Sequence, residues 1–323
     1  MSERDKYILQ VQNLKTYFYT YRGIVRALEG VNFNIEREET MGLVGETGCG
    51  KSVTSLSILR LIQYPGKILD GKIIFEGRDL LQISEEEMRT IRGDQISMIF
   101  QEPGVALNPC LRIGFQIAET ISIHQDIPLK EAEDPAIEML RVVGIPEPQK
   151  IAKAYPHELS GGMAQRAMIA MMLSTQPKLL IADEPTSSLD VTIQAQILRL
   201  LKDLIRDVQA SVLLITHDLG IVAETCDRVT VMYAGLVVES SDVRSVLKNP
   251  QHPYTQGLLK AIPRPGERGE LHTIPGLVPD LVNPPSGCRF HPRCPHAMKK
   301  CSEEQPPMFK TKAGHYVACF LFE

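Results

Sequence analysis

The chain has 323 residues and a formal net charge of −4 at pH 7, and 43% of its residues are hydrophobic. This length exceeds the roughly 150 residues of a typical single core, so one large domain with an appendage, or two domains, is expected. The slight acidic excess argues against a general attraction to nucleic acid, no run approaches the roughly eighteen apolar residues of a membrane span, and residues 1–6 are charged, unlike a secretion signal.

Short runs of β-branched and aromatic residues open the chain at residues 7–14, 17–20 and 31–35, with turn residues between them. This pattern predicts short strands of an antiparallel β layer. Tyr17, Phe18, Tyr19 and Tyr21 form an aromatic cluster in a chain without Trp. Any of these rings has the flat face needed to stack on an adenine, and packing within the strand layer explains the cluster equally well.

The next segment matches the phosphate-loop pattern GxxxxGK[ST] without a departure, at Gly45, Glu46, Thr47, Gly48, Cys49, Gly50, Lys51 and Ser52. An apolar run at 41–44 predicts a strand before it, and helical spacing from Val53 to residue 61 predicts a helix after it, as the motif requires. Lys51 would contact the β- and γ-phosphates, and the Ser52 hydroxyl would be a ligand to Mg²⁺. The segment therefore predicts a nucleoside triphosphate site; the alternative is a glycine-rich turn that matches by chance.

A strand is expected at 71–75, and Ser84 is expected to cap a helix through a capping box with Glu87. A buried strand at 96–100 then ends at Gln101. A glutamine at the end of a strand beside a phosphate loop has two uses, as a ligand to Mg²⁺ or as a hold on the attacking water. A merely solvated side chain is the alternative, because most polar residues at strand ends have no chemical role.

Residues 108–158 show helical periodicity at 113–123 and 132–143 and are interrupted by prolines, which predicts a helical insertion. The insertion ends in Ser160, Gly161, Gly162 and Met163, followed by an apolar helix. Ser160 is expected to cap this helix while the glycines leave first-turn N–H groups uncovered, so a second anion-binding helix start is predicted. Taken alone, the same opening is typical of a plain helix cap.

Two more buried strands end in polar side chains. Residues 178–182 run into Asp183 and Glu184, a helix is expected at 191–208, and the strand at 211–216 leads to His217. Because ligands bind at the carboxyl ends of strands in doubly wound sheets, these side chains would lie beside the phosphates. Asp183 suits a water-mediated hold on Mg²⁺, Glu184 suits activation of the attacking water, and His217 suits contact with the γ-phosphate. A solvated strand end and a structural histidine are the alternatives.

Together, GETGCGKS, the Gln101 turn, LSGGM, LLIADE with SSLD after it, and His217 resemble the ATP-binding subunits of ABC transporters in order and approximate spacing, over residues from about 8 to 240. The resemblance implies an α/β P-loop NTPase with a RecA-like core, an antiparallel β subdomain and an α-helical subdomain at about 102–165. It also implies a head-to-tail dimer, in which the Ser160 helix start of one subunit faces the γ-phosphate held by the other.

Three positions carry further implications of this resemblance. By its distance from Ala27 and Leu28, Phe18 matches the aromatic residue that stacks on adenine, with Tyr17 and Tyr19 as rivals. Met163 stands where many members have Gln, a departure shared with the peptide-importer branch. Cys49 lies inside the phosphate loop, which is expected to make binding sensitive to oxidation.

After an ATPase domain at 1–245, residues 246–323 resemble the extension of oligopeptide and dipeptide import ATPases through segments 249–259, 274–276 and 283–295. This loop-rich extension needs a staple, and Cys288, Cys294, Cys301 and Cys319 suit a metal centre. Their spacing, C-x5-C-x6-C-x17-C, selects no metal by itself. The resemblance favours a [4Fe–4S] cluster; a zinc site, with His291, His296 and His315 as spare ligands, and free or disulfide-linked thiols are the alternatives.

The resulting prediction is a peripheral ATPase subunit on the cytoplasmic face of the cell membrane. It would use ATP and Mg²⁺, pair with an identical or paralogous ATPase subunit, and drive di- or oligopeptide uptake through two permease subunits, with an extracellular binding protein as an indirect partner. Nickel or oligosaccharide cargo is one alternative. An ABC ATPase acting on nucleic acid is another, which the single cassette, the short insertion and the lack of a basic run disfavour.

Overall fold

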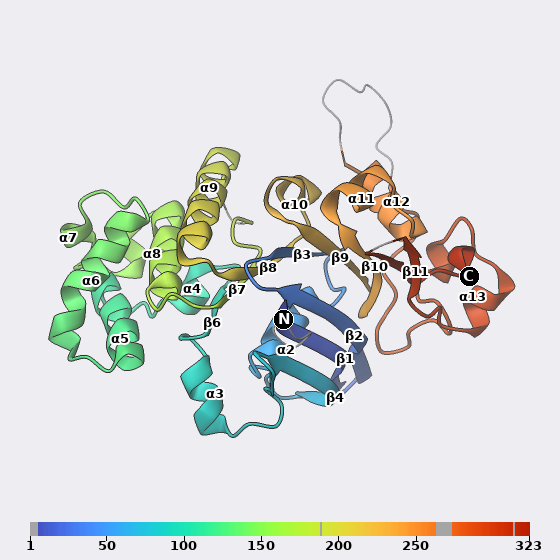
Figure 1. Ribbon diagram of the computed structural model, residues 1–323, viewed down its shortest axis with the longest axis horizontal. Coiled ribbons are helices and arrows are strands. Elements are labelled where there is room, and N and C mark those ends of the chain that lie inside the picture. Colours follow the sequence, from blue (N-terminus) through green and yellow to red (C-terminus); the bar gives the residue numbers. More distant parts are fainter. Residues whose placement is uncertain (1–5, 188, 263–272, 313) are drawn as a thin grey trace. The chain divides into compact units, whose positions relative to one another are not determined.

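The computed structural model describes residues 6–187, 189–262, 273–312 and 314–323, and Figure 1 labels the helices and strands in chain order. The chain divides into two compact units, one made of Met1–Leu81 with Leu214–Glu323 and the other of Gln82–Leu213. The chain passes from the second unit into the first within strand β8, Ser211–Thr216. The cysteine-containing C-terminal residues therefore share a compact unit with the phosphate loop.

An antiparallel sheet in the order β2-β1-β4-β5 opens the first unit. Its strands are β1 (Tyr7–Thr20), β2 (Gly23–Glu36), β4 (Gly66–Phe75) and β5 (Arg78–Asp79). The break expected after residue 14 is wrong, because β1 runs on to Thr20. The strand expected to begin at residue 31 begins instead at Gly23, directly after a turn at 21–22. Register shifts between Val11 and Leu14 absorb Asn13, whose φ of +49° makes it an extra, left-handed residue within the strand rather than a turn.

A second set of strands in this unit begins with β3 (Thr40–Val44), which confirms the strand expected before the phosphate loop. β3 pairs in parallel with β9 (Arg228–Tyr233), and β9 pairs antiparallel with β10 (Leu236–Asp242). β10 continues to β12 (His315–Val317), and β12 pairs with β11 (Phe309–Lys312). The last strands of the chain thus extend the sheet that contains the strand before the phosphate loop.

The helices of the first unit are α2 (Lys51–Ile58), α10 (Leu219–Thr225), α11 (Val243–Lys248), α12 (Pro253–Lys260) and α13 (Lys299–Glu303), with 3₁₀ turns η2 (His291–Arg293) and η3 (Phe320–Phe322). Figure 1 shows α2 beside the β1-β2-β4 layer, and the hydroxyls of Thr16 and Ser57 lie 2.9 Å apart there. One buried apolar cluster joins Val44, at the end of β3, to Tyr233, Tyr254 and Phe290. This core connects the phosphate loop with the C-terminal region.

The second unit contains the parallel pair β6 (Ile96–Ile99) and β7 (Leu179–Asp183) and a group of helices. The helices are α3 (Glu85–Ile91), α4 (Pro103–Ala106), α5 (Ile113–Gln125), α6 (Leu129–Val142), α7 (Pro148–Ile151), η1 (Pro156–Glu158), α8 (Gly161–Leu173) and α9 (Val191–Val208). The capping box at Ser84 and the helices expected in the insertion and at 191–208 are confirmed.

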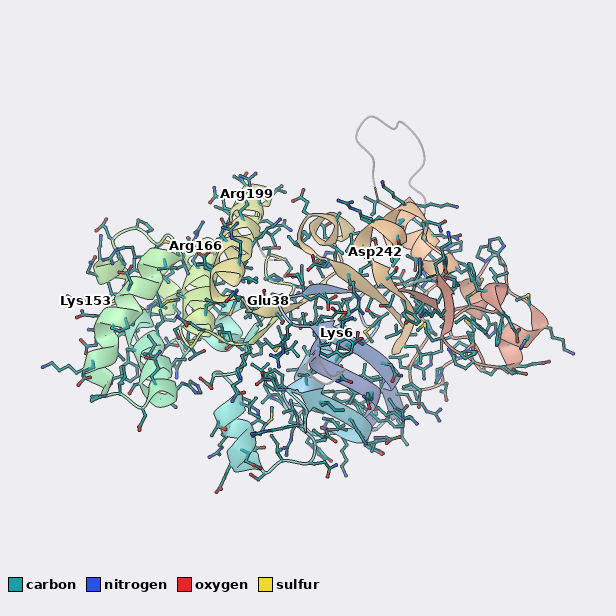
Figure 2. All side chains as sticks on the ribbon, in the orientation of Figure 1. Lys6, Glu38, Lys153, Arg166, Arg199 and Asp242 are labelled. Carbon is teal, nitrogen blue, oxygen red and sulfur yellow. The ribbon has the colours of Figure 1, made fainter. Side chains whose placement is uncertain are left out.

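Apolar faces of α5, α6 and α8 pack together in this unit, with Ile117, Leu140 and Met168 fully buried. The Arg166 guanidinium on α8 (Figure 2) donates to the Val143 carbonyl at the end of α6, 2.6 Å away, and so satisfies one of the open carbonyls of that helix terminus. None of the helices in the described ranges combines the length and the apolar character that crossing a bilayer requires.

Candidate functional site

The phosphate loop connects the buried end of β3 to the start of α2. Gly45 follows β3, and a Cβ at that position would lie 2.2 Å from the Met232 carbonyl oxygen. Gly50 caps α2 with a φ of +107°, a left-handed conformation that favours glycine, and no side chain covers the first N–H groups of the helix. The motif therefore forms the uncapped, positively polarised helix start that binds phosphate groups.

Lys51 is held at the base of this loop. It is only 6% exposed, and its Nζ donates to the carbonyl oxygens of Gly45 at 2.7 Å and Glu46 at 3.2 Å. Thr47, Gly48 and Ser52 are exposed on the same loop. Because these hydrogen-bond partners of Lys51 are neutral groups of its own loop, the ammonium has a charge to offer to phosphate oxygens that enter the loop.

Cys49 points into the core rather than toward solvent. Its side chain is fully buried, and a Cβ at Gly45 would lie 2.7 Å from its Sγ. Burial raises the pKa of this thiol, although the nearby Lys51 ammonium acts in the opposite direction. A buried, protonated thiol reacts slowly with oxidants, which argues against the oxidation sensitivity expected for this position.

The three neighbouring aromatic residues of β1 have different surroundings. The Tyr17 hydroxyl donates to both carboxylate oxygens of Glu29, at 2.7 and 2.8 Å. Tyr19 is 44% exposed, with the Lys67 ammonium 5.8 Å from its ring centroid. Phe18 is half-buried and packs so closely over Gly66 that a Cβ there would lie 2.6 Å from its ring. The Phe18 ring therefore packs on a glycine, whereas Tyr17 and Tyr19 each contact a charged side chain.

In the second unit, the structure brings Gln101 and Glu184 together. Both follow strands of the parallel pair, β6 and β7, and Gln101 Nε2 donates to Glu184 Oε2 at 3.2 Å. Asp183 is the last residue of β7 and is 5% exposed, whereas Gln101 is exposed and Glu184 is half-buried. Glu184 has a φ of +44°, an uncommon backbone conformation for this residue type that turns the chain sharply after the strand.

The second helix start forms as expected. Ser160 caps α8, and its Oγ accepts the Met163 N–H at 3.4 Å. Ser160 and Gly161 are exposed. Gly162 is required by packing, because a Cβ there would lie 3.0 Å from the Ile193 side chain on α9. The motif therefore presents exposed backbone N–H groups at the start of a 13-residue helix.

His217 is exposed directly after β8 in the first unit. The next residue, Asp218, caps α10 and accepts the N–H groups of Gly220 and Ile221 at 2.7 and 3.4 Å. The capped helix sets the backbone position of His217.

Sequence reasoning missed two side chains that bind the phosphate loop from the C-terminal region. Arg293 contacts the Glu46 carboxylate with both terminal nitrogens, at 2.7 and 3.2 Å. The Glu46 backbone N–H donates to the Tyr254 hydroxyl at 2.9 Å. No local signal in the sequence could have found the Arg293 contact, since 247 positions separate the two residues.

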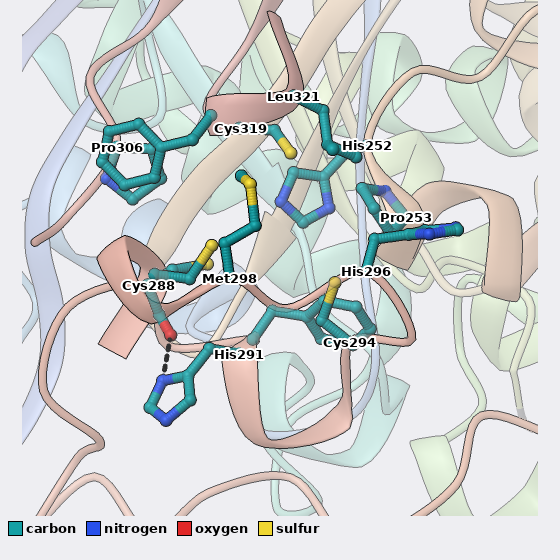
Figure 3. A pocket seen from close by; sticks show the side chains of 13 residues that line it. His252, Pro253, Cys288, His291, Cys294, His296, Met298, Pro306, Cys319 and Leu321 are labelled. Atoms are coloured by element: carbon teal, nitrogen blue, oxygen red, sulfur yellow. Dashed lines mark hydrogen bonds between the residues drawn. The ribbon is translucent and has the colours of Figure 1, made fainter. Parts of the chain in front are cut away.

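The four expected cysteines line one small cavity in the first unit, together with His252, Phe290 and Met298 (Figure 3). The backbone N–H of Cys288 donates to the Cys301 carbonyl at 2.8 Å, which fixes two of the cysteines side by side. Burial raises the pKa of the Cys288 thiol to about 11, and the three neighbouring thiols raise it further. The four cysteines expected to form a metal centre therefore lie around one cavity.

Two of the three spare histidines, His291 and His296, line the same cavity as the cysteines, and His315 does not. In Figure 3 the His291 ring is turned to the Cys288 carbonyl, and its Nδ1 lies 2.9 Å from that oxygen. His315 bonds Glu239 through Nε2 at 2.8 Å and is not among the residues that line the cavity. Within the described ranges, no group of three or more His, Cys, Asp or Glu side chains is arranged to hold a metal ion.

Comparisons with known proteins match both parts of the chain. A family model described as ABC transporter matches residues 28–187, and one described as Oligopeptide/dipeptide transporter, C-terminal region, matches residues 238–301. The chain is 54% identical to the oligopeptide transport ATP-binding protein AppD of Bacillus subtilis, over 98% of this chain and 97% of that protein. It is 50% identical to the dipeptide transport ATP-binding protein DppD of the same organism, over 97% of this chain and 94% of that protein.

Solved structures agree with the sequence matches. A dimeric, post-hydrolysis structure of the ATP-binding cassette MJ0796 bound to ADP and Pi is similar with a TM-score of 0.66 and 27% identity, over 73% of this chain and 99% of that chain. The structure of cbiO1 from Clostridium perfringens, part of the ABC transporter complex cbiONQ, is similar with a TM-score of 0.63 and 28% identity, over 76% of this chain and 92% of that chain.

Proposed function

Because the chain belongs to the family of ABC transporter ATP-binding proteins that carry the oligopeptide/dipeptide transporter C-terminal region, we propose that it hydrolyses ATP to drive peptide uptake through separate membrane subunits. The observation that carries the proposal is the phosphate loop, where Lys51 lies at an uncapped helix start. Its relatives, matched over nearly their full length, are named as oligopeptide and dipeptide transport ATP-binding proteins. Nickel or oligosaccharide cargo and action on nucleic acid find no support among these names.

We assign the ATP-binding roles to the residues of the motifs. Phe18 stacks on the adenine, the backbone from Gly45 to Val53 surrounds the phosphates, and Lys51 contacts the β- and γ-phosphates. Ser52, Gln101 and Asp183 fit Mg²⁺, because hydroxyl, amide and carboxylate oxygens are the ligands it prefers. When bound, Mg²⁺ offsets negative charge on the phosphates. Glu184 directs the attacking water, and His217 contacts the γ-phosphate.

We propose that two ATPase subunits, identical or paralogous, pair head to tail around ATP. The exposed helix start at Ser160, Gly161, Gly162 and Met163 of one subunit then covers the γ-phosphate held by Lys51 of the other. Physically, each of two anion-binding helix starts offers its N–H groups to a different side of the same phosphate. The similar MJ0796 cassette, which is dimeric and bound to ADP and Pi, supports pairing of two ATPase subunits.

The substitution Glu184→Gln tests the catalytic assignment. Glutamine keeps an oxygen that accepts the hydrogen bond from Gln101, so the geometry is preserved while the basic carboxylate is lost. We expect ATP binding to persist, turnover to fall by about 10²–10⁴-fold, and an ATP-bound dimer to accumulate on size-exclusion chromatography. Glu131→Gln, an exposed change on α6, is the matched control. Wild-type turnover in the Glu184 variant would contradict the assignment.

We propose that Cys288, Cys294, Cys301 and Cys319 hold a [4Fe–4S] cluster. Four thiols around one cavity fit a cationic centre, because ionised thiols repel one another without it. A zinc ion bound by the same four thiols is the alternative.

The cluster would act as a structural staple for a loop-rich region. Visible absorption of anaerobically purified protein, with iron and zinc analysis, tests this assignment. Absorbance near the charge-transfer bands of iron–sulfur centres with about four irons per chain is the expected result. Stoichiometric zinc without iron would overturn it.

The remaining proposals concern organisation and partners. We propose an ATPase domain at 1–245, with a helical subdomain at about 102–165, and a C-terminal extension at 246–323. The subunit would lie peripherally on the cytoplasmic face of the membrane and contact two permease subunits, with an extracellular binding protein as an indirect partner. The loop after Gln101 and the helical subdomain would transmit dimer closure to the permeases.

A further inference from the structure

Glu46 is the second residue of the phosphate loop, and three side chains hold it. Its carboxylate makes a two-point contact with Arg293, its backbone N–H donates to the Tyr254 hydroxyl, and its carbonyl accepts the Lys51 ammonium. The side chain, the N–H and the carbonyl of one residue are therefore each bonded to a different partner. Two of those partners come from the C-terminal region, which lies far outside the motif.

Arg293 is itself fixed by a complete set of hydrogen bonds. Nε donates to the Pro275 carbonyl at 2.9 Å, one terminal nitrogen donates to the Tyr233 hydroxyl at 3.3 Å, and the other donates to the Ile274 carbonyl at 3.3 Å. With the two contacts to Glu46, all five N–H donors of the guanidinium are used. Its side chain is only 6% exposed. The Arg293 guanidinium is therefore held in one orientation, and that orientation fixes the position of the Glu46 carboxylate.

Tyr254 is equally constrained. Its side chain is fully buried in α12, and its ring packs against Tyr233 and Phe290 with centroid separations of 4.6 and 5.5 Å. A buried aromatic ring in close contact with two others has little freedom to move its hydroxyl. The acceptor for the Glu46 N–H is thus rigid.

The pairing also has an electrostatic consequence for a polyanionic ligand. An unpaired carboxylate at Glu46 would repel the phosphates that enter the loop, and the Arg293 charge offsets it at 2.7 Å. Arg293 occupies η2, between Cys288 and Cys294, so the segment that supplies the guanidinium also supplies two thiols of the cavity. The conformation of the segment between Cys288 and Cys294 therefore affects the conformation of the phosphate loop.

We infer that Arg293 and Tyr254 are positioning residues for nucleotide binding, through which the C-terminal region holds the phosphate loop in its binding conformation. Neither residue touches nucleotide; both act through Glu46. This inference rests on the proposed role of the loop in ATP binding. It adds that the loop binds nucleotide less tightly when the contacts from Arg293 and Tyr254 are missing.

The test measures MgATP and MgADP affinity and steady-state kinetics in the full-length protein. Arg293→Ala should weaken nucleotide binding about tenfold or more, because it leaves Glu46 charged and unpaired beside the phosphates. The KM for ATP should rise while kcat at saturating ATP changes much less. A purely structural role would instead lower the folded fraction, and hence the apparent kcat, without changing KM.

Two gentler variants keep the inference testable if Arg293→Ala folds poorly. Tyr254→Phe removes only the hydroxyl and keeps the aromatic packing, and a loss of affinity of several-fold is expected. Glu46→Gln removes the carboxylate charge, so in its background the further change Arg293→Gln should cost clearly less affinity than it does in the wild type. Additive losses, with no coupling between the two positions, would overturn the inference.

Arg228→Ala is the matched control. Arg228 is also partly buried and paired, with Glu39 at 3.2 Å, but it lies beside the start of β3 rather than the loop at its end. It should lower stability without changing nucleotide affinity. If Lys51→Ala fails to affect binding, the proposed function fails; if Lys51→Ala weakens binding while the Arg293 and Tyr254 variants bind normally, this inference alone is refuted.

Discussion

Replacing Lys51 with alanine tests whether the loop binds phosphate. The Lys51 Nζ donates to the Gly45 and Glu46 carbonyls at 2.7 and 3.2 Å. On binding, those bonds to neutral oxygens are exchanged for bonds to charged phosphate oxygens, which contribute about 1.5–3 kcal/mol each in net terms. Since every 1.4 kcal/mol is about tenfold in affinity, the loss of one such bond weakens binding roughly 10- to 150-fold.

The lower half of that range is expected for Lys51→Ala. The substitution also removes the donor to the Gly45 carbonyl in a buried part of the loop, so it destabilises the nucleotide-free protein as well as the complex. Part of the loss of free energy is therefore common to both states and does not lower the affinity.

The assay is titration calorimetry with MgATP and MgADP in the Glu184→Gln background, where hydrolysis does not consume the ligand. Lys150→Ala, which removes an exposed lysine on α7, is the matched control and should bind as the parent does. Unchanged nucleotide affinity in the Lys51 variant, with a normal circular dichroism spectrum, would refute the assignment of this loop.

Three further predictions concern the first unit. The Glu239 carboxylate is fully buried and accepts hydrogen bonds from the Gln251 and His252 N–H groups, and it bonds His315, all within 2.9 Å. Glu239→Ala should therefore lower the free energy of unfolding by about 3–5 kcal/mol, measured by urea denaturation, and Glu239→Gln should lower it less. The Ser245 hydrogen bonds lower the pKa of Asp242, so the contribution of this helix cap is present above the ordinary aspartate pKa and is lost as the pH falls through the lowered value; in Asp242→Asn that acid dependence should disappear from the unfolding curve. Cys301→Ser should reduce the iron content and the visible absorbance together, and unchanged iron would exclude that thiol as a ligand.

Features that depend on neighbouring residues were predictable from the sequence. The phosphate loop, the cap at Ser160 and the helix α9 are formed by local hydrogen bonds and by glycine at positions that require it. Four cysteines in a loop-rich segment also indicated a metal centre, and these cysteines line one cavity. The expected break in β1 was wrong, because turn-forming residues such as Asn13 are equally suited to a bulge once a partner strand is present on each side.

The pairing of side chains from distant parts of the chain was not predictable in the same way. Gln101 meets Glu184 across 83 positions, and Arg293 meets Glu46 across 247. Each contact depends on which strands lie side by side and on the exact path of a loop between them. Neither the order of the strands nor the path of the loop can be read from the four residues that form these contacts.

By itself the sequence determined which chemistry this protein carries, because a phosphate-binding turn needs particular residues at fixed local spacing. Tertiary structure alone decided what supports that turn, by placing an arginine and a tyrosine from the cysteine-containing region against Glu46. The physical reason is that hydrogen-bond geometry within a turn is a property of a few successive residues, whereas a buried ion pair exists only after the core between its two segments has packed.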